Sequence, residues 1–391
     1  MKKRIYMDYS ATTPMKKEVL DAMLPYFTED FGNPSSVHSF GRDAKNAVNN
    51  ARETIANAIG AKREEVYFTA GGTESDNWAI KGIAKSLKSK GNHIITSKIE
   101  HHAVLHACEV LEKEGYEVTY LDVDEFGMIS LDTLKAAIKD TTILISIMFT
   151  NNEIGTIQPI KEIGAIAKEK GVLFHTDAVQ AFCNTPIDVD EMNIDMLSVS
   201  SHKIYGPKGI GAMYIRRGVR IGPYVDGGAQ ERKRRAGTEN VAGIVGFAKA
   251  VEIAMENIDS HIEKLVALRE RLRNGIMDQI PYTKYNGHPT QRHPGNVNIC
   301  FEFIEGESLL LSLDLVGVAG SSGSACTSGS LDPSHVLLGI GLTHEIAHGS
   351  LRLTVGDFTT EEDVDYVIEN LVGIVDRLRQ MSPLYEVVLN K

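Results

Sequence analysis

The chain of 391 residues has few cysteines, no long apolar run and no excess of basic charge. Its four cysteines, Cys108, Cys183, Cys300 and Cys326, are too few and too widely spaced to indicate a disulfide framework or a zinc cluster. We therefore expect a reducing, cytoplasmic setting. The net charge of −11 argues against general nucleic-acid binding. No run approaches the ~20 apolar residues of a membrane span, and the basic start reaches Asp8 too soon for a signal peptide.

The sequence instead contains an alternation of helix and strand patterns over its first two thirds. Continuous apolar runs such as Thr142–Phe149 and Met196–Ser200 predict buried strands, and helical periodicity separates them. Strands that alternate with helices predict an α/β fold, with a mostly parallel sheet sandwiched by helices. A helical stretch from about Val241 to Gln279, with a break, leads to a differently patterned C-terminal part. We expect a large domain over residues 15–258 and a smaller α+β domain over residues 259–391.

The stretch with the clearest chemical signal is Ser200-Ser-His-Lys203-Ile-Tyr-Gly-Pro-Lys-Gly209, which follows a predicted buried strand. A lysine held in a cleft at a strand end loses its proton more easily, as an amine that forms an imine must. Upstream, Asp177 also follows an apolar strand. A lysine for the covalent link and an aspartate for the pyridinium nitrogen are two fixtures of a pyridoxal phosphate site. Taken singly, Lys203 could solvate a loop and Asp177 could cap a helix.

The motifs along the chain, taken together, resemble those of the cysteine desulfurases of the NifS and IscS type. They occur in that family's order, cover nearly the whole chain and are specific only in combination. The resemblance implies an aminotransferase-like fold (fold type I) that binds pyridoxal 5'-phosphate, with residues 1–14 joining the smaller domain. Besides the lysine stretch, the matching motifs are Asp8-Tyr-Ser-Ala-Thr-Thr-Pro14, Thr73-Glu-Ser-Asp-Asn77, Glu100-His-His-Ala-Val104, Asn151-Asn-Glu-Ile-Gly155, Ala236-Gly-Thr-Glu-Asn240 and Ser321-Ser-Gly-Ser-Ala-Cys-Thr-Ser328.

The resemblance also assigns cofactor contacts. Gly72 and Thr73 open a helix after a strand, where backbone N–H groups and the helix dipole favour a phosphate, although Thr73 could simply cap the helix. The implied phosphate ligands are Gly72, Thr73, Ser200 and His202 of one subunit, with Thr238 reaching in from the other subunit of a homodimer. The implied ring contacts are Asp177 at the pyridinium nitrogen, Gln180 and Asn152 at the ring oxygen, and His101 stacked on the ring. One departure is Lys233, where the family usually has glycine.

The resemblance also implies which residues bind the substrate and which carry out the sulfur chemistry. Arg352 would bind the carboxylate of L-cysteine with its planar fork, and Asn152 would also contact the substrate. Lys203, Cys326 and His101 would be the catalytic residues. Cys326 lies among glycines and serines, which predicts a mobile loop whose thiol takes the sulfur and passes it on; a transient iron–sulfur contact is the only metal contact implied. Cys108, Cys183 and Cys300 are read as structural.

The implied function is removal of sulfur from L-cysteine, giving L-alanine and an enzyme persulfide. An iron–sulfur scaffold protein is the implied acceptor, with tRNA thiolation as a second destination. Two alternatives remain: a pyridoxal phosphate transaminase or lyase without persulfide transfer, and a sulfur-carrier or regulatory protein that has kept the fold and lost activity. His344-Glu-Ile-Ala-His348 also fits the zinc-protease pattern His-Glu-x-x-His, but the continuation of that motif is absent. We therefore predict no resident metal, no membrane contact and no direct nucleic-acid partner.

Overall fold

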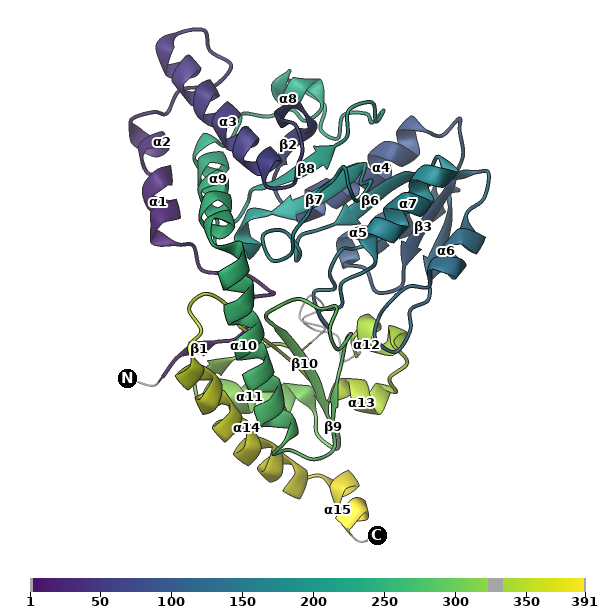
Figure 1. The fold of residues 1–391 in the computed structure, drawn as a ribbon, viewed down its shortest axis with the longest axis vertical. Helices are drawn as coiled ribbons and strands as arrows, with labels where there is room; N and C mark the ends of the chain where they lie inside the picture. The colour runs from purple at the N-terminus through teal and green to yellow at the C-terminus, as the bar shows by residue number, and fades with distance from the viewer. Residues whose placement is uncertain (1–2, 323–332, 390–391) are drawn as a thin grey trace.

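The computed structural model describes residues 3–322 and 333–389. A seven-stranded sheet forms the upper part of the molecule as drawn in Figure 1. The strand order is β2-β8-β7-β6-β5-β3-β4. Strands β7, β6, β5, β3 and β4 are parallel to one another, whereas β8 runs antiparallel to both β2 and β7. The strands are β2 (Val66–Thr69), β3 (His93–Ser97), β4 (Glu117–Leu121), β5 (Thr142–Ser146), β6 (Leu173–Asp177), β7 (Met196–Ser200) and β8 (Gly211–Ile215).

Helices cover both faces of this sheet. Successive residues of one strand enter different apolar clusters: Ile94 packs with the α4 and α5 side and Ile95 with the α3, α7 and α9 side, as the alternation of side chains along a strand requires. Burial on both faces explains the continuous apolar runs in the sequence. The mostly parallel α/β sandwich predicted from those runs is confirmed. The helices are α3 (Ser39–Asn57), α4 (Gly72–Ser86), α5 (His102–Lys113), α6 (Leu131–Ala137), α7 (Ile160–Lys170) and α9 (Val241–Glu256).

A second apolar cluster surrounds a three-stranded antiparallel sheet in the order β12-β10-β9. The N-terminal strand β1 pairs in parallel with β11, so Ile5 and Met7 pack into this cluster although they begin the chain. The strands are β1 (Ile5–Tyr6), β9 (Thr283–Tyr285), β10 (Asn296–Phe301), β11 (Val318–Ala319) and β12 (Ser350–Thr354). The helices are α10 (Ile258–Met277), α11 (Gly306–Leu315), α12 (His335–Gly339), α13 (His344–His348), α14 (Glu361–Gln380) and α15 (Pro383–Leu389).

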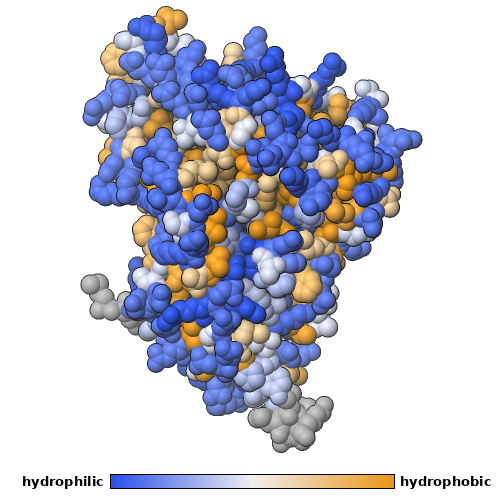
Figure 2. Space-filling model, in the orientation of Figure 1, coloured by the Kyte–Doolittle hydropathy of each residue, from blue (hydrophilic) through white to orange (hydrophobic). Residues whose placement is uncertain are grey.

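The predicted break in the long helical stretch falls at Asn257, between α9 and α10. Its backbone angles, φ −138° and ψ 33°, are not helical. The domain boundary near residue 258 stays a prediction. Three short helices complete the chain: α1 (Lys17–Met23), α2 (Pro25–Thr28) and α8 (Gln230–Lys233). Among residues 3–322 and 333–389, no helix combines the length and the apolar character needed to cross a membrane. The face shown in Figure 2 is largely hydrophilic, with hydrophobic residues scattered among hydrophilic ones.

Candidate active site

A cavity of about 280 Å³ lies beyond the carboxyl ends of β2, β3, β5, β6 and β7. This is the edge of an open α/β sheet where ligands usually bind. Ten of the twelve residues assigned above line the cavity: Gly72, Thr73, His101, Asn152, Asp177, Gln180, Ser200, His202, Lys203 and Arg352. Each of the first nine follows or ends a strand of the seven-stranded sheet, so the topology alone brings them together.

Lys203 ends a short 3-10 helix, Ser201–Lys203, directly after β7. Its Nζ donates a hydrogen bond to the carbonyl oxygen of Ala11 at 2.8 Å and another to that of Ser10. Gln180 Nε2 also donates to the Ser10 carbonyl, at 2.9 Å. The N-terminal arm, by which we mean residues 3–16 before α1, therefore orients two predicted site residues. Sequence reasoning missed this role of the arm, and the only signal was that the motif around Asp8 matches the family.

Asp177 ends β6 and is buried beneath the cavity. Its Oδ1 accepts a hydrogen bond from the backbone N–H of Val179 at 2.9 Å. Burial raises the pKa of Asp177 to about 6, while the Val179 hydrogen bond and the Lys203 ammonium act to lower it. Asp76, on α4, is also buried and lines the same cavity. Burial together with the Asp177 carboxylate raises the pKa of Asp76. Sequence reasoning missed Asp76. A cationic nitrogen placed against Asp177 would stabilise its ionised form.

The start of α4 forms an anion cradle at one end of the cavity. A Cβ added to Gly72 would meet Val179 Cγ2 at 2.6 Å, so only glycine fits there without displacement. The first backbone N–H groups of a helix have no partner within it and attract anions. His202 contacts Thr12 Oγ1 through Nδ1 at 3.1 Å. Burial and the Lys203 ammonium lower the pKa of His202 to about 4, so its ring is neutral at pH 7.

His101 caps the N-terminus of α5, where its Nδ1 accepts a hydrogen bond from the N–H of Ala103 at 3.1 Å. The proton of the neutral ring therefore sits on Nε2. Burial is the main cause that lowers the pKa of His101 to about 4, and the Lys203 ammonium lowers it further. His101 is a neutral imidazole at pH 7.

Arg352 enters the cavity from β12, far along the chain. Its Nη2 contacts Asp8 Oδ1 at 2.9 Å and its Nη1 donates to the carbonyl oxygen of Asn152 at 3.0 Å. The Nε atom is buried and makes no hydrogen bond with a described residue. The guanidinium is thus fixed in orientation at the cavity wall.

Two assigned residues are not placed in this cavity. Thr238 is exposed and does not line it. Cys326 lies outside the described residues. The three described cysteines are buried and unpaired, and burial raises the thiol pKa of Cys108 to about 12 and of Cys300 to about 11. Their structural reading fits these surroundings.

The His344–His348 motif forms the five-residue helix α13, in which His344 is exposed. Over the described parts of the chain, no group of three or more His, Cys, Asp or Glu side chains is placed to hold a metal ion.

Lys233, where the family usually has glycine, has an unusual backbone conformation. Its φ is +64°, a left-handed conformation that favours glycine, and the two preceding residues share it.

Comparison with known proteins agrees with the fold and the cavity. Residues 5–367 match the family model described as Aminotransferase class-V. This is the class of enzyme that the fold and the cavity define. A solved structure of a NifS-like protein superposes with a TM-score of 0.91 at 37% identity, covering 96% of this chain and 100% of that one.

Curated relatives indicate one group of enzymes within the class-V aminotransferases. A protein of Methanosarcina thermophila named Cysteine desulfurase IscS is 63% identical over 382 residues, which cover 98% of this chain and 94% of the relative. A protein of the same name from Clostridium botulinum is 61% identical, covering 99% of this chain and 98% of the relative. The chain belongs to the class-V aminotransferases and, within them, to the cysteine desulfurases.

Proposed function

We propose that the protein binds pyridoxal 5'-phosphate through Lys203 and converts L-cysteine to L-alanine, leaving the sulfur as a persulfide on Cys326. The observation that carries the proposal is that one cavity holds Lys203, Asp177 and the glycine start of α4 together. A lysine, a carboxylate and an anion cradle are what the aldehyde, the ring nitrogen and the phosphate of this cofactor require. We place this chemistry in a reducing cytoplasm, since the described cysteines are unpaired.

The residues present fit the cofactor. Asp177 is buried with a raised pKa, and a pyridinium cation would supply the positive partner that this burial calls for. Gly72 leaves no room for a side chain where the phosphate would meet the helix start. When bound, the cofactor supplies an electron sink for the carbanion at the substrate α-carbon. Neutral His101 is suited to lie against its ring without competing for the Asp177 carboxylate.

The chain's own groups then have separate tasks. Arg352 binds the substrate carboxylate with a guanidinium already oriented by Asp8 and Asn152. Lys203, once its amine is free, takes the proton from the substrate α-carbon as general base and delivers a proton later as acid. The Ser10 and Ala11 carbonyl oxygens hold its Nζ at this position.

Sulfur removal is the task of Cys326. Its thiolate attacks the sulfur of the bound L-cysteine, so that an S–S bond forms while the substrate C–S bond breaks. The electron pair of that bond stays with the former β-carbon, which takes up a proton and becomes the methyl group of L-alanine. A nearby cation is needed to supply thiolate at neutral pH, since a free thiol has a pKa near 8.5.

The protein would act as a homodimer with shared active sites. Thr238 is exposed and lies outside its own cavity, as a residue that serves a partner's phosphate would. Exposed apolar side chains on and after α1 and α2 supply a contact surface, namely Leu20, Leu24, Phe27 and Phe31. The persulfide would pass to an iron–sulfur scaffold protein, or to a relay for tRNA thiolation.

The visible absorption spectrum of the purified protein tests this proposal. Wild-type protein and a Lys98→Ala control, which changes an exposed lysine, should show the band of lysine-bound pyridoxal phosphate. Lys203→Ala should lack it, because among residues 3–322 and 333–389 no other lysine lines the cavity. A band in Lys203→Ala that resists dialysis after borohydride would overturn the assignment. Alanine release without sulfane sulfur would instead favour a transaminase or lyase.

A further inference from the structure

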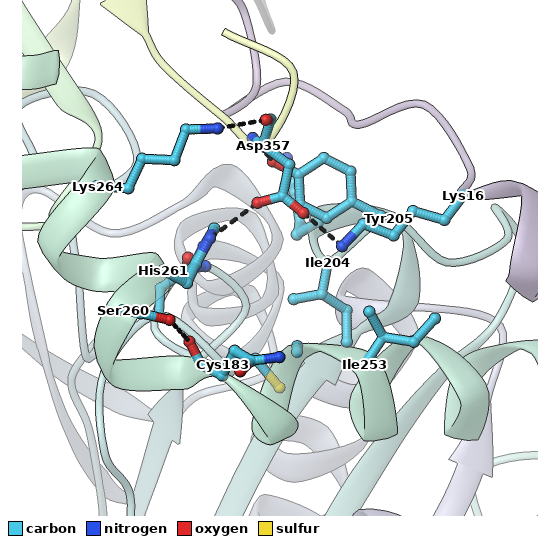
Figure 3. A pocket seen from close by; sticks show the side chains of 13 residues that line it. Lys16, Cys183, Ile204, Tyr205, Ile253, Ser260, His261, Lys264 and Asp357 are labelled. Carbon is cyan, nitrogen blue, oxygen red and sulfur yellow. Dashed lines mark hydrogen bonds and ion pairs between the residues drawn. The ribbon is translucent and has the colours of Figure 1, made fainter. Parts of the chain in front are cut away.

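Lys203 lies between two cavities. Besides the one described above, it lines a cavity of about 260 Å³ on the side of α10, shown in Figure 3. Asp357, from the loop between β12 and α14, stands in the middle of this view among Lys16, His261 and Lys264. No role assigned above uses these residues.

Asp357 connects its own loop with α10 and with the N-terminal arm. Its Oδ1 lies 2.8 Å from His261 Nδ1 of α10, and its Oδ2 pairs with Lys16 Nζ at the end of the N-terminal arm. Lys264 Nζ donates to the backbone oxygen of Asp357 at 2.6 Å. Burial acts to raise the pKa of Asp357, but the hydrogen bonds from His261 and Lys16 lower it to about 2. The carboxylate is therefore ionised throughout the working pH range.

The backbone of Asp357 is tied to Tyr205, two residues beyond Lys203. The Asp357 N–H donates to Tyr205 Oη at 2.7 Å. Tyr205 has a φ of +65°, a left-handed conformation that is unfavourable for a non-glycine residue and needs support from its surroundings. Two backbone hydrogen bonds of Tyr205 contribute to that support. Its N–H donates to Thr13 Oγ1 at 2.7 Å, and its carbonyl oxygen accepts from the N–H of Lys16 at 3.1 Å.

The N-terminal arm provides a second connection between Asp357 and Lys203. Lys16 pairs with Asp357 at one end of the arm, and its ammonium also lies 4.9 Å from the centre of the Tyr205 ring. At the other end, the Ser10 and Ala11 oxygens accept the hydrogen bonds of Lys203 Nζ. Asp357 thus reaches Lys203 twice, through Tyr205 along the backbone and through Lys16 along the arm.

We propose that Asp357 is a positioning residue for Lys203. Its carboxylate holds the arm and Tyr205 in place, and these in turn hold the lysine nitrogen where it meets cofactor and substrate. This inference rests on the proposed function. Asp357 lines a different cavity from Arg352. The loss of its carboxylate should therefore affect the chemical step more than substrate binding.

The test compares Asp357→Asn with wild-type holoenzyme. We expect kcat for L-alanine release to fall roughly tenfold or more, as small displacements of a catalytic group do, with KM changed less than about twofold. We also expect the pH midpoint of the lysine-bound cofactor's absorption band to fall by about half a unit, because the Ser10 and Ala11 oxygens would be held less firmly and would favour the protonated nitrogen less. Asp357→Glu should recover part of both changes. Asp365→Asn, which breaks an exposed ion pair with Arg271, is the matched control and should change neither.

The outcomes separate this inference from the proposed function. A wild-type protein without the band defeats the proposed function. A wild-type band together with an Asp357→Asn variant of unchanged kcat and midpoint defeats the positioning role alone. An equal loss in Asp365→Asn would also defeat it, because the effect would then be general destabilisation. If Asp357→Asn does not fold, Tyr205→Phe removes the hydroxyl acceptor instead; wild-type kcat and midpoint in that folded variant would overturn the inference.

Discussion

A buried ion pair between Arg52 and Glu231 supports the strand that leads into the anion cradle. The two side chains are 6% and 3% exposed and form a paired contact, Nη1–Oε2 at 2.6 Å and Nη2–Oε1 at 2.7 Å. Glu231 Oε2 also accepts from the N–H of Phe68 in β2, at 3.1 Å. Two residues after β2 the chain reaches Gly71, so the pair fixes the approach to the start of α4. We predict that Glu231→Gln destabilises both the fold and the cofactor site.

The size of the effect follows from the burial. Removing one charge of a buried pair costs about 3–5 kcal/mol, because the other charge stays buried without its partner. For a unit the size of the predicted large domain, 1 kcal/mol corresponds to about 2 °C in the melting temperature. The melting temperature should therefore fall by about 6–10 °C in Glu231→Gln. The glutamine amide also presents N–H donors to a guanidinium that has only donors.

Thermal melts of apoprotein and the rate of cofactor loss on dialysis measure the two consequences. Adding Arg52→Met to Glu231→Gln should recover part of the stability, because no unpaired charge then remains. Asp365→Asn, at an exposed ion pair, should cost less than about 1 kcal/mol. A Glu231→Gln protein that melts within about 2 °C of wild type, no lower than Asp365→Asn, would refute the reasoning.

Three further predictions follow from single residues. Lys233→Gly should raise the melting temperature by about 1–2 °C in thermal melts, because it relieves a left-handed backbone that costs a side chain about 1 kcal/mol; a lower value would count against this. Burial raises the pKa of Glu100 to about 8, so the folded state binds the extra proton and stability should fall as pH rises from about 5 to 8. Other groups also titrate in that window, among them His101 and His202, whose lowered pKa values act in the opposite direction. Denaturant titrations should therefore be compared between wild type and Glu100→Gln, and stability should fall more steeply with rising pH in wild type. Thr238→Ala should speed cofactor loss in the dimer, whereas dilution to a verified monomer should remove the difference between Thr238→Ala and wild type.

Local sequence patterns predicted much of the sheet and of the cavity. The meeting of Lys203 and Asp177 in one cavity could be predicted because each lies at or just beyond the carboxyl end of a buried strand, and the carboxyl ends of parallel strands share one edge. The non-helical residue Asn257 falls within the stretch where a break was expected. These features depend on short-range periodicity and on topology, which the sequence displays directly.

The rest of the site depends on contacts between distant segments. The arm that holds Lys203 lies about 190 residues before it, with contacts at sequence separations of 192 and 193. Nothing in the pattern around Asp357 indicates that it meets Lys16 and Tyr205, because the ion pair forms only when the arm, the β7 end and the loop after β12 have folded together. Asp76 was missed for a similar reason: it sits in a helix pattern that gives no sign of its burial at the same cavity as Asp177.

We propose that this chain takes sulfur from L-cysteine and holds it on Cys326, with Lys203 as the cofactor lysine. The most direct measurement is one turnover of cofactor-loaded protein with L-cysteine, counting alanine and protein-bound persulfide per active site. Wild-type protein should give one persulfide for each alanine released, at the peptide that contains Cys326. Cys326→Ser should fold and bind the cofactor normally but release alanine only at background level, since a serine hydroxyl is almost fully protonated at neutral pH. Near wild-type alanine release by Cys326→Ser would contradict the account.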